Sequence, residues 1–253
     1  MIQLGTCGYS YPEWKTVFYP EDIKPSSFLS YYSTQFSTVE IDSTYYRIPT
    51  EQQMKAMVDK APKLSFSVKA PSLLTHNIDN NWPKYGDSFI SAVSAMGDNL
   101  KAVLFQFPQS FHYTVANRRY LGSVLSMFQS FPKVVEFRQK EWYKTSVFNG
   151  LEKFDTALGL AYQPKLPDLP PLEPIVTTNF SYLRFHSNDK SAWYEDGSKR
   201  YDYLFSEEEL SSTVPLINTI SKKALNLYIY FNNHPGGKAT QNVHMLEKLL
   251  GLK

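Results

Sequence analysis

The pattern of apolar and polar positions switches repeatedly between two periods along the chain. Short runs rich in Val, Ile, Leu and Phe predict buried strands, and residues 64–70 alternate cleanly between apolar and polar side chains. The longer stretches between these runs repeat their apolar residues at helical spacing. Strands are predicted at residues 2–8, 38–42, 64–70, 102–108, 133–142, 156–161, 182–186 and 225–233.

Start and stop signals place helices between most of these strands. Residues 50–53 and 206–209 have the capping-box pattern that opens a helix, whereas Pro215 should kink or restart the helix that contains it. Helices are predicted at residues 26–35, 50–60, 87–96, 117–128, 145–154, from 206 onward and 239–250. Residues 164–174 hold five prolines and predict an extended connector, and residues 187–203 are long enough for a lid.

This alternation of strands and helices predicts an α/β protein with a parallel sheet and helices packed outside it. Eight such units favour closure into a single (β/α)8 TIM-type barrel with eight parallel strands over an open doubly wound sheet. The length of 253 residues suits one such barrel, so we expect residues 1–253 to form a single domain.

Charged side chains occur within strands that otherwise read as buried. In residues 133–142, Glu136 and Arg138 share one face while Val135 and Phe137 share the other. A buried charge is unfavourable unless it is paired, so the charged face must line a polar cavity or hold an ion pair. Polar residues at or near the C-terminal strand ends are Glu40, Asp42, Lys69, Gln106, Glu136, Arg138, Arg184, His186 and Asn232. In TIM barrels these ends form the catalytic face.

Composition narrows the class of protein only slightly. A formal charge of +2 is too small to predict binding to nucleic acid or to an anionic membrane. The one cysteine, Cys7, rules out an internal disulfide and a multi-cysteine zinc site, and we expect it to be a small buried residue. We see neither a secretory signal nor a membrane span, and expect a cytoplasmic protein without membrane association. Aromatic residues, 15% of the chain, suit a pocket that stacks on rings or sugars.

Several motifs follow one another along almost the whole chain. They are Gly5-Thr6-Cys7-Gly8-Tyr9-Ser10-Tyr11 with Trp14, Val39-Glu40-Ile41-Asp42-Ser43-Thr44-Tyr45-Tyr46-Arg47, Val68-Lys69-Ala70 with Thr75-His76, Leu104-Phe105-Gln106-Phe107-Pro108, Val135-Glu136-Phe137-Arg138 with Trp142, Arg184-Phe185-His186 and Tyr230-Phe231-Asn232-Asn233. In this order the chain resembles the YecE-like family, also called domain of unknown function 72. The resemblance implies a TIM-type barrel and no established reaction.

Three positions depart from the pattern of that family. Cys7 stands where the family usually has Ser, Gln139 where His is common, and Ser187 where Gly is common. The first two departures argue against a mechanism that needs that hydroxyl or imidazole. The third suggests a different conformation of the lid.

The ring of ionisable residues at the strand ends favours a small-molecule enzyme, either a hydrolase, a lyase or an isomerase. Its substrate would be polar and sugar-like or phosphorylated. The candidate catalytic residues are Glu136 or Glu40 as general base and His186 or His76 as acid–base partner. The candidate substrate-binding residues are the anion clamps Lys69, Arg138 and Arg184, the polar residues Asp42, Gln106 and Asn232, and the aromatic walls Tyr45, Tyr46, Trp14 and Trp142.

Two alternatives stay open. Glu40, Asp42, Glu136, His76 and His186 offer ligands for a divalent metal such as Zn²⁺ or Mn²⁺, although no metal-binding spacing of histidines occurs and nearby cations would repel the ion. Aromatic residues interleaved with Lys and Arg in residues 193–203 are also typical of a binding protein for nucleic acid or a polar ligand. We predict no cofactor beyond that alternative metal, and the sequence does not indicate an oligomeric state.

Overall fold

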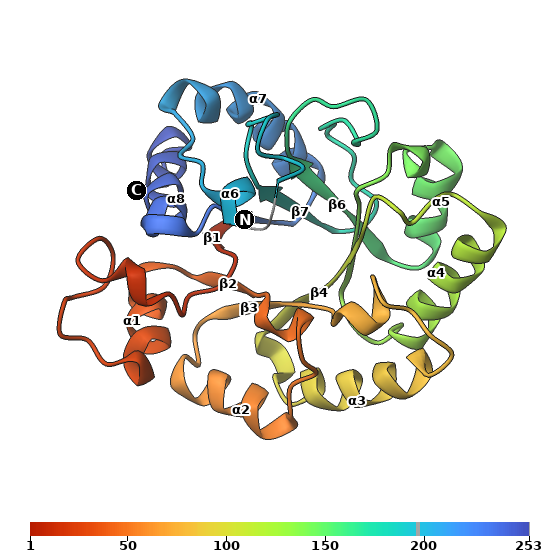
Figure 1. The fold of residues 1–253 in the computed structure, drawn as a ribbon, viewed down its shortest axis with the longest axis horizontal. Coiled ribbons are helices and arrows are strands. Elements are labelled where there is room, and N and C mark those ends of the chain that lie inside the picture. Colours follow the sequence, from red (N-terminus) through yellow and green to blue (C-terminus); the bar gives the residue numbers. More distant parts are fainter. Residues whose placement is uncertain (196–197, 253) are drawn as a thin grey trace.

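The computed structural model describes residues 1–195 and 198–252. In this part of the chain, eight parallel strands form one sheet that curls into a nearly closed barrel with helices outside it (Figure 1). The strands are β1 (Ile2–Thr6), β2 (Thr38–Ile41), β3 (Ser65–Lys69), β4 (Leu100–Phe107), β5 (Lys133–Phe137), β6 (Thr156–Tyr162), β7 (Phe180–Phe185) and β8 (Asn226–Phe231). The predicted TIM-type barrel is therefore confirmed.

Two helices begin where their capping boxes place them. The side chains of Thr50 and Ser206 accept hydrogen bonds from the backbone three residues on, which completes both capping boxes. The third helix begins at Trp82 rather than at residue 87, because Pro83 is well suited to the first turn of a helix. The helices are α1 (Phe28–Gln35), α2 (Glu51–Lys60), α3 (Trp82–Ser94), α4 (Val115–Met127), α5 (Thr145–Lys153), α6 (Ser198–Tyr201), α7 (Glu207–Lys223) and α8 (Lys238–Leu249).

Helix α7 runs through Pro215 without restarting, so that part of the prediction is wrong. A proline in a helix leaves the carbonyl four residues earlier without its N–H partner. Here that carbonyl belongs to Ser211, and both Ser211 and Pro215 are exposed. Water can therefore satisfy the carbonyl, which makes the proline tolerable on this face.

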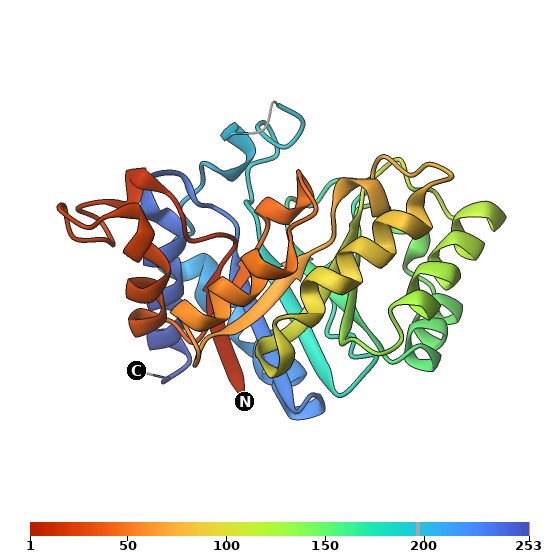
Figure 2. The same cartoon turned by 90° about the horizontal axis from the view of Figure 1, so that it is seen from below.

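Two connections above the barrel depart from the regular alternation. The link from β6 to β7, residues 163–179, is described throughout and contains no helix, in agreement with the predicted extended connector. After β7, the chain rises over one end of the barrel and carries the short helix α6 there (Figure 2). Within the described residues, no helix is both long and apolar enough to span a bilayer.

β1 and β2 are the two ends of the hydrogen-bonded order of the sheet, and the barrel closes between them through an isolated backbone bridge of Cys7 with Glu40 and through a side chain. The hydroxyl of Tyr32, from α1, accepts a hydrogen bond from the Thr6 N–H at 2.9 Å and donates one to the Thr38 carbonyl at 3.0 Å. A Cβ atom on Gly5 would lie 2.0 Å from the Thr38 oxygen. The absence of a side chain at Gly5 thus lets the strands approach, and we call this contact the seam.

Candidate functional site

An ion cluster fills the centre of the barrel. The guanidinium of Arg184, on β7, contacts Glu136 Oε2 at 3.1 Å and Glu40 Oε1 at 2.8 Å, and Tyr182 donates a hydrogen bond to Glu40 Oε2 at 2.7 Å. Both carboxylates are fully buried and Arg184 is 1% exposed. Burial raises the pKa of Glu136, but the charges of Arg138 and Arg184 outweigh it and hold that pKa below its usual value. We call Glu40, Glu136 and Arg184 the floor cluster.

Arg138 connects the floor cluster to His186. Its Nη2 atom lies 2.6 Å from Glu136 Oε1 and 2.7 Å from His186 Nε2. A guanidinium can only donate, so Nε2 accepts and the neutral imidazole carries its proton on Nδ1. The Asn232 amide, whose Nδ2 atom lies 3.1 Å from Nδ1, must then turn its oxygen toward the ring to accept that proton. Burial, together with Arg138 and Arg184, holds the pKa of His186 well below its usual value. His186 is therefore a neutral residue that orients Arg138.

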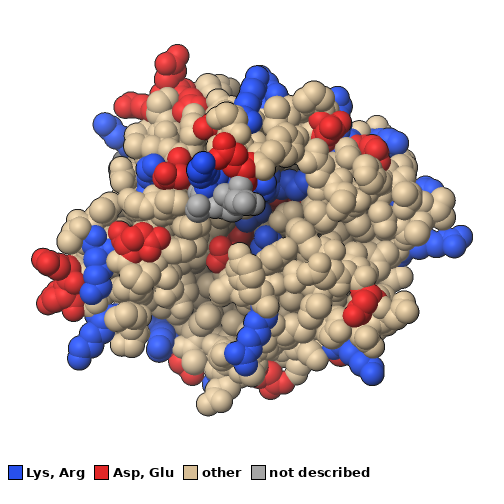
Figure 3. Space-filling model, viewed as in Figure 1, with Lys and Arg blue, Asp and Glu red and all other residues tan. Residues whose placement is uncertain are grey.

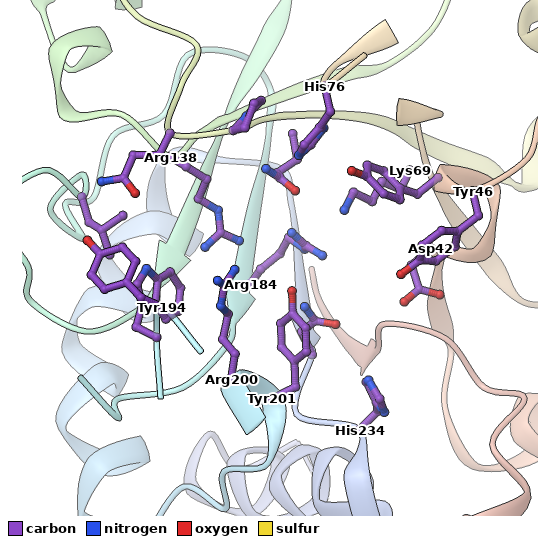
Figure 4. Close-up of a pocket in the computed structure, with 17 residues that line it drawn as sticks. Asp42, Tyr46, Lys69, His76, Arg138, Arg184, Tyr194, Arg200, Tyr201 and His234 are labelled. Atoms are coloured by element: carbon purple, nitrogen blue, oxygen red, sulfur yellow. The ribbon is translucent and has the colours of Figure 1, made fainter. Parts of the chain in front are cut away.

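A cavity of about 430 Å³ lies above the floor cluster at the C-terminal ends of the strands, as predicted for a TIM barrel (Figure 4). Two side chains reach the cavity from below: Arg184, which belongs to the floor cluster, and Arg138, which contacts the cluster through Glu136. Nine predicted site residues line it: Asp42, Tyr45, Tyr46, Lys69, His76, Gln106, Arg138, Arg184 and Asn232. Segments that are far apart in sequence thus contribute polar side chains to one cavity. Figure 3 shows basic and acidic side chains together in a central hollow on this face of the molecule.

Three ionisable side chains on one side of the cavity have perturbed proton affinities. Burial, and to a smaller extent the charge of Arg184, lowers the pKa of Lys69 to about 8. The Nζ atom of Lys69 lies 4.3 Å from the centre of the Tyr45 ring. Burial and then Lys69 lower the pKa of His76 to about 4. Burial and then Glu40 raise the pKa of Asp42. Lys69 and Asp42 are thus the cavity groups whose shifted pKa values favour proton transfer closer to neutral pH.

The opposite side of the cavity is cationic. Arg138 and Arg200 both lie over the ring of Trp193, at 5.5 and 5.1 Å from its centre. Figure 4 shows the head groups of Arg138, Arg184 and Arg200 pointing into the cavity. Among the described residues, no carboxylate forms an ion pair with Lys69 or Arg200. The buried Nε atoms of Arg184 and Arg200 also have no hydrogen-bond acceptor within the described part of the chain.

Three predicted catalytic residues are placed behind the cavity. Glu40, Glu136 and His186 are fully buried and do not line it, because each is held against an arginine below the surface. The structure thus places these three predicted residues in contact with Arg138 or Arg184 and not at the surface of the cavity. Of the predicted catalytic residues, only His76 faces the cavity.

The two tryptophans that were predicted to wall the cavity, Trp14 and Trp142, do not line it. Trp14 is fully buried and donates its indole N–H to the His234 carbonyl at 2.7 Å. Trp142 stacks on Phe137 with the ring centres 4.5 Å apart and donates to the Phe111 carbonyl at 2.6 Å. Each indole satisfies its polar atom within the core, so the expectation that they wall the cavity is wrong. Cys7 is buried as expected, and burial raises the pKa of its thiol well above the usual value.

Sequence reasoning did not include several lining residues among the candidates. They are Gln109, Trp193, Tyr194, Arg200, Tyr201 and His234. The signal for four of them was the aromatic and basic composition of residues 193–203, which predicted a binding segment without indicating where it would lie. Residues 196–197 of that segment fall outside the described residues. The described part of the segment places Trp193 and Arg200 at the cavity.

The carboxylates and histidines do not come together as a metal centre. In residues 1–195 and 198–252, no three His, Cys, Asp or Glu side chains lie close enough to hold a metal ion. The candidate ligands Glu40 and Glu136 instead pair with Arg184. This geometry gives no specific support to the metal-dependent alternative.

Known structures share the fold of this chain. A structure of a DUF72 family protein from Thermotoga maritima is 33% identical, covers 99% of both chains and superposes with a TM-score of 0.89. A second DUF72 family structure, from Enterococcus faecalis, is 24% identical over all of this chain and 96% of its own, with a TM-score of 0.87.

Sequence comparison gives the same result. The UPF0759 protein YunF from Bacillus subtilis is 26% identical over 273 residues, which cover this chain completely and 96% of YunF. The family model described as "Protein of unknown function DUF72" matches residues 3–253. The chain belongs to the DUF72 family, whose activity and substrate are not established.

Proposed function

We propose that the protein is an enzyme, a lyase or isomerase, that moves a proton on a small anionic and sugar-like substrate, such as a phosphorylated sugar. The observation that carries this proposal is the excess of cationic donors in the cavity. Lys69 and Arg200 line the cavity and have no carboxylate partner among the described residues. A phosphate or carboxylate would supply the missing acceptors.

The arginines would divide the binding of that anion between a fixed part and an adaptable part. The floor cluster holds Arg184 through two of its nitrogens, which leaves Nε without a partner among the described residues. Arg138 is fixed by Glu136 and His186. Arg200 comes from the segment above the mouth and stacks on Trp193. It would complete the anion site from above, where hydrogen bonds from guanidinium groups to oxyanions are strong.

Proton transfer would fall to Lys69 and Asp42. Both line the cavity, and both have pKa values shifted toward neutral pH. A catalytic base or acid is most effective when its pKa lies near the operating pH. The general base would therefore be a carboxylate, as expected, but that of Asp42 instead of the buried Glu136 or Glu40.

Calorimetric titration with fructose 6-phosphate and fructose tests the anion site. We expect the phosphorylated sugar to bind more tightly and the difference to shrink at high salt. Arg200→Gln should lower the affinity for the phosphorylated sugar about tenfold or more, because it removes a charged hydrogen-bond donor. Arg119→Gln, a change of an exposed arginine on α4, is the matched control. Equal binding of both sugars, or no effect of Arg200→Gln, would contradict the anion site.

The proton-transfer role is tested in the same samples. In deuterated water, the wild type should exchange a carbon-bound hydrogen of a sugar phosphate drawn from a panel of aldose and ketose phosphates, as followed by proton NMR. Asp42→Asn should slow the exchange at least about a hundredfold, the usual contribution of a general base. Exchange at the wild-type rate in that variant would show that Asp42 is not the base.

No specific observation favours the two alternatives enough to put either forward. Arg200 and Trp193 line the cavity together with Tyr201. This placement supports recognition of a small enclosed ligand more than of an open nucleic-acid strand, which needs an accessible groove. Two of the three candidate metal-binding carboxylates, Glu40 and Glu136, are paired with Arg184.

A further inference from the structure

We propose that Lys69 is a covalent nucleophile whose amine condenses with the carbonyl group of the substrate to form a Schiff base. The substrate class would then be an anionic aldehyde or ketone, such as a sugar phosphate in its open-chain form. This inference rests on the proposed function, because the anion bound by the arginines is what would bring the carbonyl to Lys69.

The amine of Lys69 has no hydrogen-bond acceptor among those described for this chain. Lys69 is the last residue of β3, and its side chain lines the cavity. The contact described for its Nζ atom is the face of Tyr45, which takes no proton from it in a conventional hydrogen bond. Another lysine on a barrel strand, Lys133, instead donates to the carbonyl of Phe131 at 3.2 Å. Lys238, on the surface, pairs with Asp202 at 2.6 Å.

The surroundings favour the neutral, nucleophilic form of this amine. Burial and the neighbouring Arg184 bring the pKa of Lys69 to about 8. At neutral pH this gives roughly two hundred times more free amine than an ordinary exposed lysine with a pKa near 10.4. A desolvated lysine beside other cations is the arrangement that activates lysine toward carbonyl substrates.

The chemical step balances without an oxidant or reductant. The nitrogen lone pair forms a bond to the carbonyl carbon, the carbonyl π electrons move to oxygen, and a proton passes from nitrogen to that oxygen. The resulting hydroxyl takes a further proton and leaves as water while the nitrogen lone pair forms the C=N bond of the iminium ion. Asp42, with its raised pKa, lies in the same cavity and can supply that proton.

The iminium ion explains why the anion site and Lys69 share one cavity. Its positive charge would be unfavourable beside Arg138 and Arg184 alone, but a bound phosphate balances it. The iminium nitrogen can then accept the electron pair when a neighbouring C–H bond breaks. The proton released in that step would pass to the Asp42 carboxylate, which is free to accept it after giving up its proton to the departing water.

Borohydride trapping tests the proposal. Wild-type protein is incubated with dihydroxyacetone phosphate, reduced with sodium borohydride and mapped by peptide mass spectrometry. We expect reductive addition of the probe at Lys69, at least about tenfold above any other lysine, because the free-amine fraction is so much larger there. Excess inorganic phosphate should suppress the labelling, and dihydroxyacetone without phosphate should label Lys69 more weakly.

Lys69→Arg is the matched variant, since it keeps the positive charge but cannot form an imine. It should lose the specific label while still binding fructose 6-phosphate. Labelling spread evenly over surface lysines in the wild type, with binding of fructose 6-phosphate intact, would overturn the Schiff base and leave the proposed anion site standing. Failure of the wild type to bind any phosphorylated sugar would overturn both. Competitive acetylation of the unliganded wild type supplies a second readout, in which Lys69 should titrate near pH 8.

Discussion

His76 shows how the cavity sets the charge of a single residue. Its ring packs edge-on against Tyr45, with the centres 4.9 Å apart, and Nδ1 lies 2.9 Å from the Thr75 hydroxyl. Burial and the nearby Lys69 both oppose protonation and lower the pKa to about 4. The native protein therefore keeps His76 neutral across a range of pH in which an unfolded chain would protonate it.

This difference predicts a pH-dependent stability. Between the pKa of about 4 in the folded protein and the ordinary value near 6.5, the unfolded state binds the extra proton, so the free energy of unfolding should rise with pH. The contribution is present above about pH 6.5 and is lost as the pH falls toward 4. Urea unfolding of His76→Gln should show a shallower rise in this window than the wild type. Parallel curves for the two proteins would contradict the prediction.

Depth inside the barrel is the property that single residues do not reveal in the sequence. The two-residue period correctly placed Glu136 and Arg138 on one face, and both contact each other. The same pattern does not say which of them ends below the cavity surface, because depth depends on how neighbouring strands are staggered. The expectation therefore gave Glu136 a direct catalytic role, whereas the structure buries it under Arg184.

At the scale of elements, Gly159 on β6 leaves little room for a side chain against β5. A Cβ atom on Gly159 would lie 3.0 Å from Glu136 Cβ and 3.0 Å from Val134 Cγ1. Both neighbours are fully buried and fixed by the strand. A side chain here would displace Glu136 and with it the contacts of the floor cluster.

Gly159→Ala should lower the free energy of unfolding by about 1–3 kcal/mol, the usual range for overpacking a core. Gly122 provides the matched control, because it lies within α4 and a Cβ atom there would meet nothing within 4 Å. Gly122→Ala should stabilise the protein by about 0.5–1 kcal/mol through helix propensity. Chemical denaturation measures both, and similar effects of the two changes would contradict the close approach at Gly159.

Elements with local signals were predictable. The capping residues Thr50 and Ser206 set two helix starts, and the prolines of residues 164–174 marked the connector without a helix. The start of α3 at Trp82 was missed because the loop before it has no strong cap. The continuation of α7 through Pro215 depends on exposure of the helix face, and exposure is a tertiary property.

At the scale of the whole molecule, the barrel closes through Tyr32 together with a short backbone contact. The Tyr32 hydroxyl bridges Thr6 and Thr38 across the seam, and beside it the Gly8 N–H donates to the Glu40 carbonyl at 2.7 Å. The alternation of eight strands and their helices predicted a barrel, but nothing in the strand sequences indicated that a helix side chain would complete it. Sequence periodicity describes each element separately, whereas closure joins the two ends of the sheet.

Tyr32→Phe should destabilise the protein by about 1–3 kcal/mol, because it leaves the buried Thr6 N–H without its acceptor. Hydrogen exchange should quicken most at the amides of β1 and β2. Tyr31→Phe, on the same helix, is the control, since its hydroxyl makes none of the hydrogen bonds described for this chain. An equal loss of stability in both variants would argue that the ring, and not the seam contact, is what matters.

The floor cluster also has a consequence for how tightly a ligand can bind. A free arginine side chain carries about 2 kcal/mol of rotamer entropy, and most of it is normally lost when the side chain grips a ligand. Here Glu40 and Glu136 immobilise Arg184 during folding. A ligand that contacts the Arg184 guanidinium from the cavity therefore meets a group that is already in place, and its binding free energy is not diminished by ordering that side chain.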